Sequence, residues 1–186
     1  MQSWKRIRKK MESAVKGKTV ALVTGASSGI GYEYARQLAE RRYNLLLVSN
    51  EEEPIQRVAR ELSIHYSVSV EGLYRDLSNL DAASSLYCYC RENDIVVEIL
   101  INNAGILLPF DKSYNYSEEA VEKCMNTNFN SCRYAINSML PVLRKSIMPG
   151  ILNISSSDAL APIIGTGIYS ASKAALKAYS GQLIRN

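Results

Sequence analysis

The stretch VTGASSGIG, residues 23–31, lies between an aliphatic run, TVALVTG (19–25), and a segment with helical spacing, GIGYEYARQLAERR (29–42). Its glycines let a chain turn tightly from a strand into a helix and bring the backbone close to a phosphate, which the helix N-terminus favours. The same letters spell G-x-S-x-G, the turn that carries the nucleophile of many hydrolases, here Ser27. That alternative needs an acid and then a histidine later in the chain. The one histidine, His65, comes too early for this order, so the phosphate interpretation is favoured.

Strand-like and helix-like segments alternate along the rest of the chain. Continuous apolar runs such as LLLV (45–48) and IVVEILI (95–101) are typical of parallel strands covered on both faces. The alternation predicts right-handed βαβ units, and hence an α/β fold with a doubly wound, Rossmann-like parallel sheet whose ligands bind at the carboxyl ends of the strands. We expect strands at 19–25, 43–49, within 65–77, at 95–103 and at 150–156, and helices at 29–42, 51–63, 80–93, 118–145 (after Ser117 as N-cap) and 167–185.

The composition indicates one globular domain, residues 18–186, after a basic leader, residues 1–17. Of the 186 residues, 47% are hydrophobic and 22% are charged. Residues 1–18 hold seven Lys or Arg against one acid, Glu12, so the formal charge of +4 leaves −2 for residues 19–186. This balance argues against a nucleic-acid-binding face. No apolar run reaches the ~20 residues of a membrane span, so we expect a cytoplasmic protein.

The leader and the cysteines have simple interpretations. In the leader, Trp4, Ile7, Met11 and Val15 share one helical face among basic residues, which is compatible with peripheral contact to an anionic membrane. A solvated N-terminal extension is the favoured alternative. The four cysteines form no CxxC pair and the chain has one histidine, so we expect reduced thiols and no metal site.

Three more motifs accompany the glycine-rich turn. The sequence NNAG (102–105) follows the fourth predicted strand, ISS (154–156) ends the fifth, and YSASK (169–173) begins thirteen residues after Ser156. In this order and spacing, over residues 18–186, the motifs resemble the short-chain dehydrogenase/reductase family. The resemblance implies an NAD- or NADP-dependent oxidoreductase that interconverts a small-molecule alcohol and a carbonyl by hydride transfer. It also implies a homodimer or homotetramer.

The catalytic candidates are Ser156, Tyr169, Lys173 and Asn128. Tyr169 and Lys173 are four residues apart and share a face of a helix. An ammonium beside a phenol favours the phenolate, so Tyr169 could act as general acid and base, and Ser156 would hydrogen-bond the substrate oxygen. The resemblance assigns Asn128 to a water chain that leads to the lysine, and Asn126 is the alternative register.

The resemblance also assigns cofactor contacts. NADP-binding members commonly carry Arg or Lys at the positions of Ser28 and Asn50, whereas NAD-binding members often place an acid after the second strand, where Glu51 is the first. Both cofactors therefore stay open. The cofactor-binding residues that we predict are Gly25, Ser27, Gly29, Ile30 and Gly31 at the pyrophosphate, Asn50 after the second strand, Asp76 and Leu77 at the adenine, Asn103, Ala104 and Gly105 at the ribose, and Tyr169 with Lys173.

In the family the sheet continues past the YxxxK motif into further strands, a proline–glycine loop and a substrate lid, whereas this sequence stops at Asn186. We therefore expect a chain truncated after its fifth strand and the following helix, with that strand at an edge of the sheet. The alternative function is a catalytically silent dinucleotide-binding or scaffold protein.

Overall fold

The computed structural model describes residues 18–144, 146 and 148–183, and these form one parallel sheet in the order β3-β2-β1-β4-β5. Central β1 pairs with β2 on one side and β4 on the other, so that Val23 lies opposite both Leu47 and Ile101. The strand order reverses between β1 and β4, and this is the point where parallel α/β sheets bind ligands. The predicted fold class is confirmed. The strands are β1 (Lys18–Thr24), β2 (Leu45–Ser49), β3 (Val70–Tyr74), β4 (Ile95–Asn102) and β5 (Gly150–Asn153).

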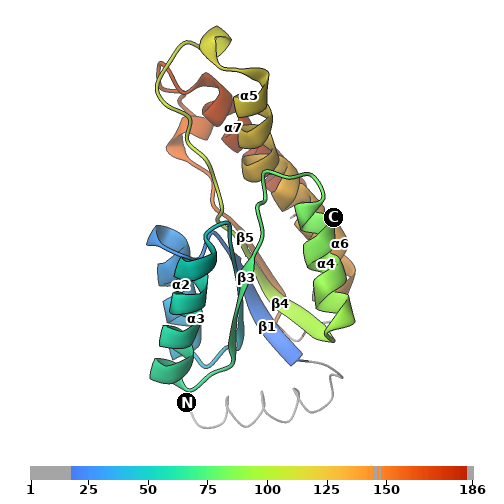
Figure 1. The fold of residues 1–186 in the computed structure, drawn as a ribbon. Coiled ribbons are helices and arrows are strands. Elements are labelled where there is room, and N and C mark those ends of the chain that lie inside the picture. The colour runs from blue at the N-terminus through green and yellow to red at the C-terminus, as the bar shows by residue number, and fades with distance from the viewer. Residues whose placement is uncertain (1–17, 145, 147, 184–186) are drawn as a thin grey trace.

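Helices cover both faces of the sheet (Figure 1). On one face α2 (Gly29–Glu40) and α3 (Glu52–Tyr66) pack against the strands, and on the other α4 (Ala82–Glu92), α6 (Ser131–Leu143) and the end of α7 (Gly167–Leu183) do so. The segment α5 (Glu118–Met125) and the start of α7 lie beyond the strand ends, at the top of the view. No helix among the described residues combines the length and hydropathy needed to cross a bilayer.

The central strand explains the continuous apolar runs of the sequence. Successive β1 side chains alternate between faces, so Val20 and Leu22 join one core and Ala21 and Val23 the other. All four are fully buried, since helices cover both sides. Strand β5 instead ends the sheet in the described part of the chain, and its Leu152 is 38% exposed, as expected for an edge.

The largest differences from the predicted elements are at the long helix, the end of α3 and the end of β5. The single helix expected over 118–145 is divided by a π-helical turn, η2 (Asn126–Asn130), between α5 and α6. Helix α3 continues to Tyr66 and ends on Ser67, which is left-handed (φ 52°), so β3 begins only at Val70. Strand β5 stops at Asn153 because the chain turns into a 3₁₀ helix, η3 (Ser157–Ala159), that Ser156 caps. A second 3₁₀ turn, η1 (Ser113–Asn115), follows β4. The leader and its possible membrane contact lie outside the described residues.

Candidate active site

The glycine-rich turn forms an open cradle at the start of α2. Gly25 and Gly29 adopt left-handed backbone angles (φ 63° and 56°), which glycine adopts without strain. A Cβ added to Gly29 would meet nothing within 4 Å, and the neighbouring Ile30 is 60% exposed. The N-cap, Ser28, makes no side-chain hydrogen bond to the helix. The N–H groups of the first turn therefore face open space and can receive an anion.

The other side of the turn is packed against the end of β4. A Cβ on Gly31 would lie 2.1 Å from the Gly25 carbonyl oxygen and 2.5 Å from Asn103 Nδ2. The same Nδ2 donates to the carbonyl oxygens of Thr24 and Gly25, at 3.0 Å each. The Asn103 side chain thus fastens the NNAG segment to the cradle, a structural role that the family resemblance did not assign to it.

Thr24 is a site residue that sequence reasoning missed. Its Oγ1 accepts hydrogen bonds from the backbone N–H of Asn103 (3.0 Å) and of Ala104 (3.1 Å), and its side chain is buried. This hydroxyl sets the direction in which the chain leaves β4. The available signal was a hydroxyl residue at the last strand position before the first glycine.

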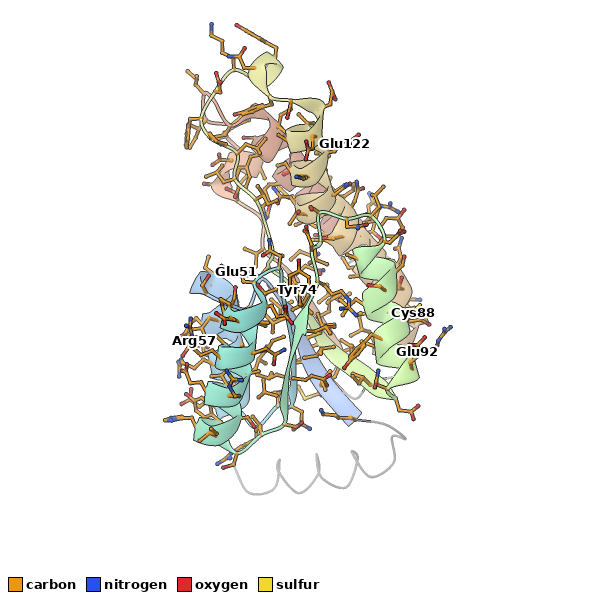
Figure 2. All side chains as sticks on the ribbon, viewed as in Figure 1. Glu51, Arg57, Tyr74, Cys88, Glu92 and Glu122 are labelled. Carbon is orange, nitrogen blue, oxygen red and sulfur yellow. The ribbon has the colours of Figure 1, made fainter. Side chains whose placement is uncertain are left out.

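A carboxylate closes the cradle on the β2 side. The Oγ of Ser27 donates to Glu51 Oε2 at 2.7 Å, and the Oγ of Ser49 donates to Ser27 at 3.0 Å. Figure 2 shows Glu51 at the N-terminal end of α3, on the same edge of the sheet as Tyr74. Because Glu51 accepts the Ser27 hydrogen bond, this first acid after the second strand is held beside the glycine turn. Asn50, predicted to contact the cofactor, is exposed there.

The two predicted adenine contacts lie in the loop after β3. Leu77 is buried, and Asp76 is exposed with its Oδ1 accepting the Ser78 N–H at 3.0 Å. Asn126 Nδ2 donates to the Ser78 carbonyl oxygen at 3.0 Å, which ties this loop to the π-helical turn. Asp76 and Leu77 therefore lie just after the carboxyl end of β3, and their contact with an adenine stays a prediction.

Lys173 is buried at the carboxyl end of β5, with 4% of its surface exposed. Its Nζ donates to the Ile154 carbonyl oxygen at 2.8 Å and lies 5.9 Å from the centre of the Tyr169 ring. Burial lowers the pKa of this ammonium from its ordinary value. A Cβ on Gly105 would be 3.3 Å from Nζ, so the NNAG segment passes directly beside the charge.

Asn128 is fully buried and holds that segment in place. Its Nδ2 donates to the Ile106 carbonyl oxygen and to Ser172 Oγ, both at 2.9 Å, and its Oδ1 accepts the Ile106 N–H at 2.7 Å. The side chain thus joins the loop after β4 to α7. Since Asn126 instead bonds Ser78, the geometry favours Asn128 for a place beside the lysine. π-helical turns often accompany functional sites, and this one presents Asn128 to the loop.

Ser156 and Tyr169 lie at the two ends of the loop that connects β5 to α7. Ser156 caps η3 by accepting the Asp158 N–H at 3.2 Å, and Tyr169 is half-buried in the first turn of α7. The 3₁₀ turn packs against α7. The structure brings Lys173, Gly105 and Asn128 into direct proximity, while Ser156 is connected to the start of α7 through other polar side chains. Among the described residues, no group of three or more His, Cys, Asp or Glu side chains could hold a metal ion.

A parallel sheet that opens a glycine-lined, uncapped helix N-terminus at its switch point has the architecture of the dinucleotide-binding, Rossmann-like class. Comparison with known families supports this classification, since residues 19–186 match the family model described as short chain dehydrogenase. The chain belongs to the short-chain dehydrogenase/reductase family.

Several relatives show how far the likeness extends. The human "inactive hydroxysteroid dehydrogenase-like protein 1" is 32% identical over 166 residues, which are 88% of this chain and 49% of that protein. The very-long-chain 3-oxoacyl-CoA reductase of Kluyveromyces lactis is 34% identical over 180 residues, 90% of this chain and 51% of the relative. A short-chain dehydrogenase from Sphingobium yanoikuyae, solved in complex with NADPH, superposes with a TM-score of 0.80 at 33% identity, covering 89% of this chain and 63% of the other. The chain thus spans about half the length of these two curated relatives.

Proposed function

We propose that this chain carries the cofactor-binding and proton-transfer residues of an NAD(P)-dependent oxidoreductase that interconverts an alcohol and a carbonyl. The observation that carries the proposal is the buried Lys173 ammonium, four residues from Tyr169 and next to the NNAG segment. No carboxylate in the described part of the chain forms an ion pair with Lys173, and such a buried cation stabilises an anion formed nearby. A phenolate at Tyr169 is such an anion, so this residue is suited to exchange a proton with a substrate oxygen.

The cradle residues fit a dinucleotide. The left-handed Gly29 leaves open space beside the uncapped first turn of α2, which suits a pyrophosphate. When bound, the nicotinamide supplies or accepts the hydride. The chain's own contribution is to hold the substrate oxygen between the Ser156 hydroxyl and the Tyr169 phenol. Lys173 stabilises the phenolate, and Asn128 keeps the Gly105–Ile106 backbone beside that lysine.

The surface near these groups favours a substrate with an apolar body. Two loops, 106–116 and 157–166, are held together where the Asp111 N–H donates to the Gly165 carbonyl oxygen at 3.2 Å, and the Tyr116 hydroxyl oxygen lies 3.0 Å from the same atom. The second loop joins Ser156 to Tyr169 directly. The names of the two curated relatives refer to a hydroxysteroid and a very-long-chain acyl compound, which are both large and apolar. The exposed apolar side chains on these loops are Leu107, Phe110, Tyr114, Leu160, Ile163 and Ile164.

The decisive experiment compares two phenol deletions on the same helix in the full-length protein. We expect Tyr169→Phe to lower turnover of a ketone panel by about 10²- to 10⁴-fold, the range typical of general acid–base catalysis. Binding of NADPH, followed by its fluorescence, should persist with reduced affinity, because the glycine cradle is untouched and the Tyr169 hydroxyl is the one predicted cofactor contact that is lost. Tyr179→Phe is the matched control, since Tyr179 lies near the far end of α7 and its hydroxyl bonds Asn137 of α6. Equal activity of Tyr169→Phe and Tyr179→Phe would reject the proposal.

A catalytically silent dinucleotide-binding protein is the second candidate, and the word "inactive" in the name of the human relative supports it. This candidate predicts NADPH binding by the full-length protein without turnover of any carbonyl compound. Turnover that depends on Tyr169 would exclude it.

A further inference from the structure

We propose that Asp158 is a positioning residue: its backbone N–H fixes the Ser156 oxygen, and its buried carboxylate holds the first turn of the Tyr169 helix through Thr166 and Ser170. The proposal rests on the function proposed above, because Ser156 and Tyr169 receive their roles there. Asp158 is 7% exposed and lies in the loop that connects β5 to α7. It belongs to neither the glycine motif nor the YxxxK motif.

The carboxylate is held by hydroxyl groups. Its Oδ2 accepts from Thr166 Oγ1 at 3.1 Å, and its Oδ1 lies 3.4 Å from the Ser156 hydroxyl and 3.5 Å from that of Ser157. Within the described ranges, no Lys or Arg forms an ion pair with Asp158. Burying an ionised carboxylate is unfavourable unless hydrogen bonds replace its water. The Thr166 hydroxyl, the nearest side-chain donor at 3.1 Å, must therefore remain in place beside it.

The direction of the hydrogen bonds follows from the charge. A carboxylate can only accept hydrogen bonds. Thr166 has one hydroxyl hydrogen and two possible acceptors, the Asp158 carboxylate at 3.1 Å and the Ile163 carbonyl oxygen at 2.9 Å. Because a charged acceptor binds a hydrogen more strongly than a neutral one, Thr166 donates to Asp158. The 2.9 Å contact between Thr166 Oγ1 and Ser170 Oγ then has Ser170 as donor. Ser170 directly follows Tyr169 in α7. A directed chain of bonds thus runs from the first turn of the Tyr169 helix to Asp158.

The other end of the link fixes the Ser156 oxygen but leaves its hydrogen available. The backbone N–H of Asp158 donates to Ser156 Oγ at 3.2 Å and occupies one lone pair. The carboxylate oxygen at 3.4 Å is too far to hold the hydroxyl hydrogen firmly. Ser156 can therefore turn its hydrogen toward a substrate oxygen while its own oxygen stays in place.

These bonds fix the Ser156 hydroxyl and the Tyr169 phenol relative to each other, and under the proposed function both must reach the same substrate oxygen. Misplacement of a reacting group by about 1 Å can lower a rate ~10²-fold, so a loosened frame reduces turnover. The cofactor cradle lies on β1, α2 and the end of β4, outside this loop. Its affinity for the cofactor should not depend on Asp158.

The test uses Thr166→Val, which is nearly isosteric and deletes the donor, with Thr166→Ser as the matched control that keeps it. In the full-length protein we expect Thr166→Val to lower kcat by about 10- to 100-fold. We expect the Kd for NADPH, from fluorescence titration, to stay within about twofold of the wild type. Thr166→Ser should restore kcat. Asp158→Asn, which keeps one acceptor oxygen, should fall between the two.

Amide hydrogen exchange gives a reading that does not need activity. Thr166→Val should speed exchange in both 156–159 and 166–170, whereas Thr166→Ser should not. In an active protein, an unchanged kcat or unchanged hydrogen exchange in Thr166→Val would overturn the proposal. A parallel loss of kcat and of NADPH affinity in both Thr166 variants would also overturn it. The two proposals can fail separately. If the wild type binds NADPH but turns over no carbonyl compound, the proposed function is rejected. If Thr166→Val, and not Thr166→Ser, then still speeds exchange in both segments, the link through Asp158 is retained.

Discussion

The Nζ of Lys173 donates a hydrogen bond to the carbonyl oxygen of Ile154, 2.8 Å away, and so fastens α7 to the segment that leaves β5. One charge thereby serves two purposes, because the lysine supports the local fold and provides the cation near Tyr169. The predictions below separate these purposes from those of the cofactor cradle.

The first prediction concerns pH and Lys173. Burial lowers the pKa of Lys173 below its ordinary value of 10.5. Below the lowered pKa the lysine is charged in the folded and in the unfolded chain, and the folded chain bears the full desolvation cost of the buried ammonium. Between the two values the unfolded chain binds more protons, so stability rises with pH. We expect the free energy of unfolding of the wild type to increase relative to that of Lys173→Met as the pH rises toward 10.5. Urea unfolding at several alkaline pH values measures this, and a pH-independent difference contradicts it.

The second prediction concerns the hydroxyl of Thr24. Thr24→Val leaves the N–H groups of Asn103 and Ala104 without their acceptor, and each unsatisfied buried donor costs about 1–3 kcal/mol. We expect a loss of about 2–4 kcal/mol in the free energy of unfolding and weaker NADPH binding. Thr24→Ser keeps the acceptor and should cost less than about 1 kcal/mol. If both variants are equally stable, the hydroxyl does not organise the NNAG segment.

The third prediction contrasts two glycines of the cradle. Gly31→Ala forces a Cβ to within 2.1 Å of the Gly25 oxygen, so we expect strong destabilisation, about 3 kcal/mol or more. Gly29→Ala meets no atom within 4 Å and carries only the left-handed strain of about 1–2 kcal/mol. It should fold but bind NADPH at least about tenfold more weakly, because its methyl occupies the open space of the cradle. Thermal melting and fluorescence titration of both variants test the contrast. Wild-type affinity in Gly29→Ala would show that the cofactor does not approach there.

The fourth prediction concerns cofactor choice and Glu51. Its carboxylate, 2.7 Å from Ser27 Oγ, repels a further phosphate near the end of β2. We expect Glu51→Gln to raise the ratio of NADPH to NADH affinity by about tenfold, which corresponds to ~1.4 kcal/mol. Glu52→Gln, at the next position on the first turn of α3, is the control. An unchanged ratio in Glu51→Gln would place the ribose away from this carboxylate.

Much of the architecture could be predicted because local signals agreed with the global fold. The apolar runs of β1, β2 and β4 predicted buried parallel strands, and the glycine spacing predicted the turn before α2. The π-helical turn escaped prediction because it depends on distant partners: Asn126 bonds the loop after β3, and Asn128 bonds the loop after β4. Sequence spacing contains no record of such contacts.

The candidate site was predicted unevenly for the same reason. Motif spacing proposed Lys173, and the family resemblance proposed Asn128 with Asn126 as the alternative. The fold brings Lys173 and Asn128 to Gly105. Motif spacing missed Thr24 and Asp158, because a lone hydroxyl or acid has no periodicity and acquires meaning only from what the fold places beside it. The roles of the site residues, the cytoplasmic location and self-association stay predictions.

The Asn103 side chain bonds the Thr24 and Gly25 carbonyl oxygens, so the NNAG segment joins the glycine turn on one side to the surroundings of Lys173 on the other. Under the proposed function, a substitution in the loop before α7 acts on proton transfer, whereas one in the glycine turn acts on nucleotide affinity. The same fold can therefore support a protein that binds a dinucleotide without turning over a carbonyl compound.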